Sequence, residues 1–250
     1  MYLTNKVAVI TGGSSGIGRA TAVKFAREGA QVVIADVNVT AGQAVVAEVQ
    51  GAGGQARFCQ TDVADFDQVA RAVNLAVETF GNIHIMFNNA GIGHFTPLLD
   101  QTPELYDKVV KVNQYGVFYG ILAAGRKMRD LGTHGVIINT ASVFALLASS
   151  AVISYHASKA AVKMMSQAAA LELAPYHIRV VAIAPGGVDT AMIQGYKDLG
   201  LGDAIAKQQM RGSLLQPEAI ANAVALLASD DANAINGSMV MVDDGYAEFK

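Results

Sequence analysis

The chain has 250 residues and a formal net charge of −3; 52% of the residues are hydrophobic and only 16% are charged. A near-neutral chain without a Lys/Arg cluster gives no indication of nucleic-acid or membrane-surface binding, and no apolar run approaches the ~18 to 20 residues that a membrane span requires. No Pro/Ser-rich linker or charge block divides the sequence, and no leader pattern precedes the first predicted strand, so we expect one cytoplasmic domain over residues 1–250.

The first predicted strand, residues 7–11, ends in a glycine-rich turn, Thr11-Gly12-Gly13-Ser14-Ser15-Gly16-Ile17-Gly18, and a segment with helical periodicity follows it. Glycines at 12, 16 and 18 let the backbone turn sharply and approach an anion closely. The helix N-terminus then presents free N–H groups and its positive dipole end to that anion. The turn therefore predicts a phosphate-binding site, although glycine turns also occur for packing alone.

Strand-like and helix-like segments alternate along the whole chain. The apolar runs lie at about 7–11, 31–35, 56–60, 83–88, 135–140, 178–184 and 238–242. This alternation predicts a three-layer α/β fold, a doubly wound parallel sheet of about seven strands with helices on both faces. Right-handed crossovers place the ligand crevice beyond the C-terminal ends of the strands, so residues that follow each strand are the candidates for a site.

Polar residues follow the second, third and fourth strands. Asp36 lies twenty positions after Gly16, where a carboxylate can bind the hydroxyls of an adenosine ribose and repel a 2′-phosphate. Asp62, which precedes Val63, is either an acceptor for an adenine amino group or a local turn residue. The segment Asn88-Asn89-Ala90-Gly91 offers small and amide-bearing residues to line a cofactor cleft, although a plain Asx turn has the same composition.

A long helix is predicted from Thr102 to about Asp130, with threonine as N-cap and Pro103 at the first helical position. Asn113 lies in its middle, where asparagine has a poor helix propensity. Tertiary packing or function therefore retains it.

The fifth strand ends at Thr140-Ala141-Ser142, and the next helix carries Tyr155 and Lys159 in its first turns. Positions i and i+4 share a helix face, so the phenol and the ammonium project into one cleft. One cation ~4 Å from a phenol supplies the ~4 kcal/mol that brings its pKa from ~10 to near 7, at an effective dielectric of ~20. Such a pair alone is usually a surface contact, and its meaning depends on the other motifs.

Together these motifs resemble the short-chain dehydrogenase/reductase family, in its single-domain branch of roughly 250 residues. The resemblance covers essentially the whole chain and is carried by Thr11-Gly12-x-x-x-Gly16-x-Gly18, Asp36, Asn88-Asn89-Ala90-Gly91, Asn113, Ser142, Tyr155-x-x-x-Lys159 and Pro185-Gly186. It implies that Tyr155 is the general acid/base of a hydride transfer. It further implies that Lys159 lowers the pKa of Tyr155 and holds the nicotinamide ribose, that Ser142 bonds the substrate oxygen, and that Asn113 keeps a water in a proton relay.

The resemblance also implies a cofactor site and a pocket. The expected cofactor-binding residues are Gly12, Ser14, Ser15, Gly16, Ile17, Gly18, Asp36, Asp62, Val63, Asn89, Ala90, Gly91, Tyr155, Lys159, Pro185, Gly186, Val188 and Thr190. Residues 190–216 correspond to a substrate lid, and His94, Phe144 and Met192 are expected to line the pocket with Ser142. The turn after the last strand has Asp244 where the family often has a second glycine; we expect the turn to survive, because Asp tolerates the left-handed region.

These inferences predict an NAD-dependent dehydrogenase that interconverts a small, partly apolar secondary alcohol and its ketone and assembles as a homotetramer through the helices at about 102–130 and 154–174. No metal is expected, because the histidines show no ligand spacing. NAD is favoured because Asp36 repels a 2′-phosphate and the turn contains no basic residue, with Arg19 as the one cation in reach. The alternatives are a 3-oxoacyl carrier-protein reductase, which would want NADPH and a basic docking surface, and a catalytically silent nucleotide-sensing regulator.

Overall fold

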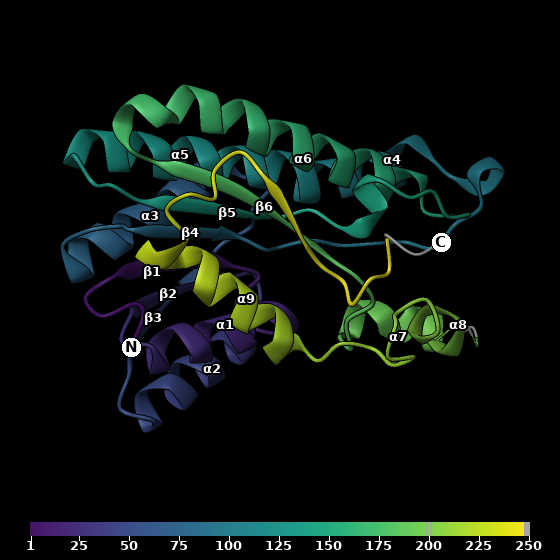
Figure 1. Cartoon of the computed structure of the whole chain (residues 1–250), viewed down its shortest axis with the longest axis horizontal. Helices are drawn as coiled ribbons and strands as arrows, with labels where there is room; N and C mark the ends of the chain where they lie inside the picture. The colour runs from purple at the N-terminus through teal and green to yellow at the C-terminus, as the bar shows by residue number, and fades with distance from the viewer. Residues whose placement is uncertain (199, 201, 248–250) are drawn as a thin grey trace.

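The computed structural model describes residues 1–198, 200 and 202–247. Its centre is a seven-stranded sheet in the order β3-β2-β1-β4-β5-β6-β7, with every neighbouring pair parallel (Figure 1). The strands are β1 (Val7–Thr11), β2 (Gln31–Asp36), β3 (Gln55–Gln60), β4 (Ile85–Asn88), β5 (Val136–Thr140), β6 (Arg179–Pro185) and β7 (Met239–Val242). The predicted fold class is confirmed, and every strand begins and ends within about two residues of its predicted bounds.

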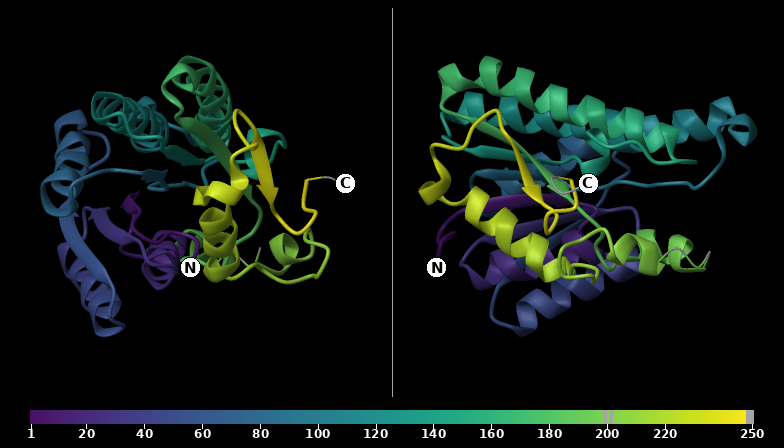
Figure 2. Two further views of the ribbon diagram at one scale, coloured as in Figure 1. Left: turned by 60° about the vertical axis from the view of Figure 1, so that its left-hand side comes forward. Right: turned by 45° about the vertical axis from the view of Figure 1, so that its right-hand side comes forward.

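Helices cover both faces of this sheet (Figures 1 and 2). One face carries α1 (Gly16–Arg27), α2 (Val39–Gly51) and α9 (Pro217–Ala228), and the other carries α3 (Phe66–Phe80), α5 (Gly116–Leu131) and α6 (Ile153–Leu173). Two shorter helices, α7 (Ala191–Asp198) and α8 (Gly202–Ala206), lie beyond the C-terminal ends of the strands.

The strands are buried on both sides, which explains their continuous apolar runs. Successive residues of β1 enter opposite halves of the core: Ile10 packs beneath α1 and α2, and Val9 packs beneath α3. The same alternation follows from the period of two in every strand. The sheet is therefore fixed in register between two apolar layers, and its C-terminal edge becomes a rigid platform for polar residues.

The predicted long helix from Thr102 to about Asp130 is not one regular α-helix. It begins as predicted, because the Thr102 hydroxyl accepts the N–H of Leu105 at 3.2 Å and α4 (Pro103–Val110) opens with proline. A π-helical turn, Lys111–Tyr115, then separates α4 from α5. Asn113 lies fully buried in this wide turn, the kind of interruption often found at functional sites.

The turn after β7 survives its aspartate, as expected. Asp244 adopts a left-handed φ of 51° and Gly245 a φ of 74°. The Asp244 carbonyl accepts the N–H of Met210 at 2.9 Å, its carboxylate accepts the N–H of Arg211 at 2.9 Å, and the Arg211 guanidinium lies 3.3 Å from the carboxylate. The aspartate thus ties the end of the predicted lid segment to the C-terminal turn.

Candidate active site

The glycine turn after β1 forms a close-packed backbone cradle at the C-terminal edge of the sheet. A Cβ on Gly12 would lie 2.8 Å from the Ala90 Cα, and a Cβ on Gly18 would lie 2.0 Å from the Gly12 carbonyl oxygen. Both glycines are therefore required by close approach of backbone to backbone. Because α1 begins at Gly16, its first N–H groups face the cradle, and the arrangement suits a phosphate or pyrophosphate.

Residues at the end of β4 and directly after it are hydrogen-bonded to this turn. The Thr11 hydroxyl accepts the N–H groups of Asn89 and Ala90 at 3.0 and 3.2 Å, and the Asn89 side-chain amide donates to the carbonyls of Thr11 and Gly12 at 3.1 and 3.3 Å. Asn88 lies one residue deeper and donates to Asn139 at 2.8 Å. The Asn89 amide therefore stabilises the glycine turn. Ala90 and Gly91 follow Asn89 directly along the chain.

Asp36 lies where the sequence places it, at the end of β2 and against the cradle. One carboxylate oxygen accepts the N–H of Ser14 at 3.1 Å and the other accepts the N–H of Asn38 at 2.9 Å. A carboxylate has about four acceptor positions, so both oxygens can still bind ribose hydroxyls. Arg19 is held elsewhere, by two hydrogen bonds to Glu48 on α2 at 2.8 and 2.9 Å.

Other predicted cofactor residues have mainly structural contacts. The Asp62 carboxylate accepts the N–H of Ala64 at 2.9 Å, which is the local-turn alternative left open by the sequence. Val63 is buried against Gly116, where a Cβ would lie 2.8 Å from its side chain. Ile17 packs against the core beneath α1, and its carbonyl accepts the Thr21 hydroxyl. Each lies beside the crevice, at a strand end or in the glycine turn.

Tyr155, Lys159 and Ser142 meet above the ends of β5 and β6. The Lys159 ammonium lies 5.4 Å from the centre of the Tyr155 ring and donates to the Thr140 carbonyl at 2.7 Å. The Tyr155 hydroxyl is hydrogen-bonded with Ser142, whose oxygen also accepts the N–H of Phe144 at 3.1 Å. The phenol and the ammonium therefore lie close together, as their spacing of four residues in a helix predicts.

The electrostatics of this group differ from the expected ones. Burial raises the pKa of Tyr155 to about 12, and the hydrogen bond with Ser142 opposes that rise without cancelling it. Burial also lowers the pKa of Lys159 to about 8. The expectation that the lysine charge brings the phenol near neutral pH is wrong for the protein by itself, because desolvation dominates both groups.

Asn113 joins α6 to the loop after β4. Its side-chain oxygen accepts the N–H of Ile92 at 2.8 Å, and its amide donates to the Ile92 carbonyl at 2.8 Å and to Ser158 at 3.2 Å. Ser158 in turn donates to the Tyr155 carbonyl at 2.8 Å. Asn113 therefore positions α6, and its expected role in holding a water stays a prediction.

The predicted pocket residues differ in how they approach Tyr155. The Phe144 ring lies 6.4 Å from the Tyr155 ring in an edge-to-face arrangement. A Cβ on Gly93 would lie 3.7 Å from the Tyr155 ring and 3.9 Å from Met192, so Met192 faces Tyr155 across Gly93. His94 makes no hydrogen bond or ring contact with these side chains in the described part of the chain, and its Nε2 is buried without a partner there.

The loop after β6 covers the cradle. The Thr190 methyl would lie 3.1 Å from a Cβ on Gly16. Pro185 ends β6, Gly186 follows it, and buried Val188 forms a parallel bridge with Leu215. Two hydrogen bonds complete this bridge: Asp189 N–H donates to the Leu215 carbonyl at 2.8 Å, and Leu215 N–H donates to the Gly187 carbonyl at 2.9 Å.

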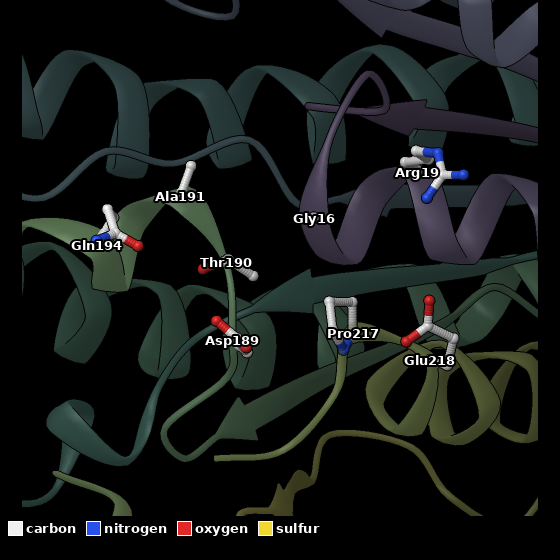
Figure 3. A pocket seen from close by; sticks show the side chains of 8 residues that line it. All are labelled: Gly16, Arg19, Asp189, Thr190, Ala191, Gln194, Pro217 and Glu218. Carbon is white, nitrogen blue, oxygen red and sulfur yellow. The ribbon is translucent and has the colours of Figure 1, made fainter. Parts of the chain in front are cut away.

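A cavity of about 570 Å³ opens between the cradle and this loop (Figure 3). Its lining comes from α1, the loop after β6, α7 and α9, and consists of Gly16, Arg19, Asp189, Thr190, Ala191, Gln194, Pro217 and Glu218. Of the expected lid, 190–216, the residues Leu199 and Leu201 lie outside the described residues. In the described ranges, no group of three or more His, Cys, Asp or Glu side chains is placed to hold a metal, and no helix is long and apolar enough to cross a bilayer.

The sequence analysis did not single out Tyr246, Phe95 or Tyr196, which make ring contacts beside the predicted pocket residues. The Phe144 ring lies 6.3 Å from the Tyr246 ring, and the Phe95 ring lies 5.6 Å from the Tyr196 ring. The spacing of Met192 and Tyr196, four residues apart in a helix, is a signal for Tyr196. Tyr246 is far away along the chain and gave no such signal.

Comparison with known proteins gives matches over nearly the full length. A family profile described as enoyl-(acyl carrier protein) reductase matches residues 12–247. The 2,5-dichloro-2,5-cyclohexadiene-1,4-diol dehydrogenase LinX of Sphingobium indicum is 41% identical over 98% of this chain and 97% of its own. The cyclohexanol dehydrogenase of an Acinetobacter species is 39% identical over 97% of this chain and 95% of its own.

Solved structures agree with these relatives. A short-chain type dehydrogenase/reductase from Mycobacterium marinum superposes with a TM-score of 0.95 at 35% identity, covering 98% of this chain and 97% of that one. Levodione reductase superposes with a TM-score of 0.93 at 36% identity, covering 99% and 100%.

Proposed function

Because the chain belongs to the short-chain dehydrogenase/reductase family, we propose that it interconverts a small secondary alcohol and its ketone with NAD, using Tyr155 as general acid/base. The observation that carries this proposal is the hydrogen bond between Tyr155 and Ser142 directly beside the buried Lys159 ammonium. A substrate oxygen placed between the two hydroxyls is within reach of a proton donor and of a second hydrogen bond.

Tyr155, Lys159 and Ser142 have separate roles in the proton transfer. The raised pKa of Tyr155 keeps the phenol protonated, so it is ready to give a proton to the oxygen of a ketone. In alcohol oxidation the same oxygen takes the proton, and the neighbouring Lys159 cation stabilises the phenolate that precedes this step. Ser142 orients the substrate oxygen. When bound, NAD supplies or accepts the hydride.

The cradle and Asp36 fit an adenine dinucleotide. Glycine backbone and the start of α1 suit the pyrophosphate, Asp36 suits the ribose hydroxyls, and Tyr155 and Lys159 suit the nicotinamide ribose. NAD is preferred to NADP in this proposal because Arg19, the cation in reach of the turn, is already paired with Glu48. Residues 190–216 form the lid over the substrate.

The proposed substrates are alicyclic alcohols and ketones. Relatives named for cyclohexanol, cyclopentanol and a cyclohexadiene diol support this class, and the aromatic edges of Phe144 and Phe95 with the thioether of Met192 suit an apolar ring. The test is NADH formation with cyclohexanol, cyclopentanol and 2-butanol, and NADH or NADPH consumption with acyl thioesters. Turnover of thioesters alone would favour a 3-oxoacyl carrier-protein reductase, and no turnover would favour a regulator.

We also propose that α5 and α6 form subunit contacts in a homotetramer. Ala160, Met164, Ala168 and Leu171 lie on one face of α6, and all are exposed, Met164 by 61% and Leu171 by 79%. The two helices lie side by side on the outside of the sheet (Figures 1 and 2). The small residues Ala123, Ala124 and Ala170 of these helices are buried in the chain's own core, so the larger apolar residues supply the contact.

A further inference from the structure

The segment 143–152 joins the end of β5 to the start of α6 and lies beside Tyr155. Both of its ends are buried, Val143 at 3% and Val152 at 1% exposed, while Leu146 between them is 50% exposed. A loop with an exposed middle depends on a few contacts to keep one conformation. The contacts of its inner residues therefore decide how firmly this side of the site is held.

His156, which follows Tyr155 directly on α6, contacts this segment at two places. The Ser149 N–H donates to the His156 Nε2 at 2.7 Å, and the Ser149 carbonyl lies 3.1 Å from the same nitrogen. An imidazole that accepts at Nε2 carries its proton on Nδ1. The His156 ring also meets the Phe144 ring edge-to-face, with the ring centres 4.9 Å apart and an angle of 79°. One side chain of α6 thus holds both the beginning and the middle of the segment.

Phe144 connects this contact to the reacting groups. Its N–H donates to the Ser142 hydroxyl oxygen at 3.1 Å, and its ring lies 6.4 Å from the Tyr155 ring. Ser142 is in turn hydrogen-bonded with Tyr155. A displacement of Phe144 therefore changes the space beside both hydroxyls.

The far end of the segment is under backbone strain. Ala151 has a φ of 64°, in the left-handed region that alanine rarely adopts. Its carbonyl accepts the N–H of Thr96, in the loop after β4, at 2.8 Å. Such a conformation persists only where the surrounding contacts enforce it. Release of the middle of the segment therefore favours relaxation at Ala151 and weakens its bond to Thr96.

We infer that His156 is a positioning residue, which fixes the segment 143–152 in the conformation that receives the substrate and takes no part in the proton transfer. The inference rests on the proposed function for the identity of the reaction. Without the acceptor at Nε2, the segment is displaced in part of the molecules, and KM rises as the binding-competent fraction falls. Substrate binding restores the segment, and Lys159 stays bonded to the Thr140 carbonyl in either case, so kcat is retained.

Glutamine and asparagine at position 156 give a matched pair of variants. The glutamine side-chain oxygen lies as many bonds from the backbone as the histidine Nε2, whereas the asparagine oxygen lies one bond short. His156→Gln therefore keeps an acceptor for the Ser149 N–H and His156→Asn loses it. His156→Leu, which retains apolar volume, is a second variant without an acceptor.

The first measurement is the kinetics of cyclohexanol oxidation. We expect KM to rise roughly three- to tenfold in His156→Asn and His156→Leu, the effect of about one net hydrogen bond, while kcat stays within about twofold of wild type. His156→Gln is expected to stay within about twofold of wild type in both constants. A side chain that only stabilised the fold would instead lower the active fraction, and with it kcat, at an unchanged KM.

The second measurement reads the segment without turnover. Chymotrypsin cleavage after Phe144, Leu146 or Leu147, identified by mass spectrometry, is expected to be roughly three- to tenfold faster in His156→Asn and His156→Leu than in wild type and His156→Gln. Cleavage follows the population of the open form when opening and closing are fast.

A raised KM at retained kcat together with faster cleavage, both reversed in His156→Gln, supports the inference, and any other combination in folded variants overturns it. Thermal melting checks folding, and His156→Leu alone decides if His156→Asn does not fold. A wild type that is inactive with every alcohol tested refutes the proposed function, and the cleavage rates then decide on His156 by themselves.

Discussion

Burial of the Lys159 ammonium destabilises the folded state, and replacing this lysine with methionine allows the destabilisation to be measured. Lys159 is 2% exposed, and burial lowers its pKa from 10.5 to about 8. This shift corresponds to about 3 kcal/mol of unfolding free energy that the folded state loses below pH 8, where the unfolded chain binds the proton more strongly. As the pH rises from 7 to 9.5, the folded state regains about 2 kcal/mol of this unfolding free energy, because Lys159 loses its proton in the folded state first.

Urea unfolding of wild type and Lys159→Met at equal protein concentration measures this difference. Wild type is expected to gain about 2 kcal/mol relative to the variant between pH 7 and 9.5, while the variant loses activity at every pH. Lys163→Met is the control, one turn along α6 and partly exposed, and its difference from wild type is expected to stay flat over this range. Measurements stop at pH 9.5, below the midpoint of ordinary tyrosine ionisation. A difference between wild type and Lys159→Met that stays flat or falls from pH 7 to 9.5 would refute the argument that desolvation governs this lysine.

The remaining predictions concern chemistry, cofactor and assembly. Tyr155→Phe is expected to keep NAD binding while kcat falls ~10²- to 10⁴-fold, and near-normal kcat would exclude the phenol as acid/base. Asp36→Ala combined with Val37→Arg is expected to raise kcat/KM with NADP relative to NAD, since Val37 is 60% exposed beside Asp36; an unchanged ratio would remove Asp36 from the ribose site. Met164→Glu with Leu171→Glu is expected to reduce the particle mass in light scattering, and an unaltered mass would place the interface elsewhere.

The sheet was predictable because its strands obey a local rule. A parallel strand buried on both sides is a short apolar run, and the runs ending at Thr11 and Thr140 show this without any knowledge of their neighbours. The glycines at 12 and 18 were equally readable, because a backbone approach that excludes a Cβ leaves few other residues.

Features that depend on several distant segments were not predictable. In the π-helical turn, Asn113 is hydrogen-bonded to Ile92 of another loop. No pattern within the helix itself predicts this turn. The pKa of Tyr155 depends on how completely neighbours exclude water, which spacing along a helix does not reveal. Tyr246 meets the Phe144 ring because β7, which precedes it, lies beside β6 at the sheet edge.

The bridge between Val188 and Leu215 lies where the predicted substrate lid joins the rest of the domain. The bridge holds the two ends of this segment together, while Met210 and Arg211 within it are bonded to Asp244 of the C-terminal turn. A segment of different length or sequence that keeps the contact with Asp244 can therefore be grafted between 189 and 214 without altering the strand register that holds Ser142. Exchange of the segment at these two positions is therefore expected to change the substrate range while the sheet and the glycine turn stay in place.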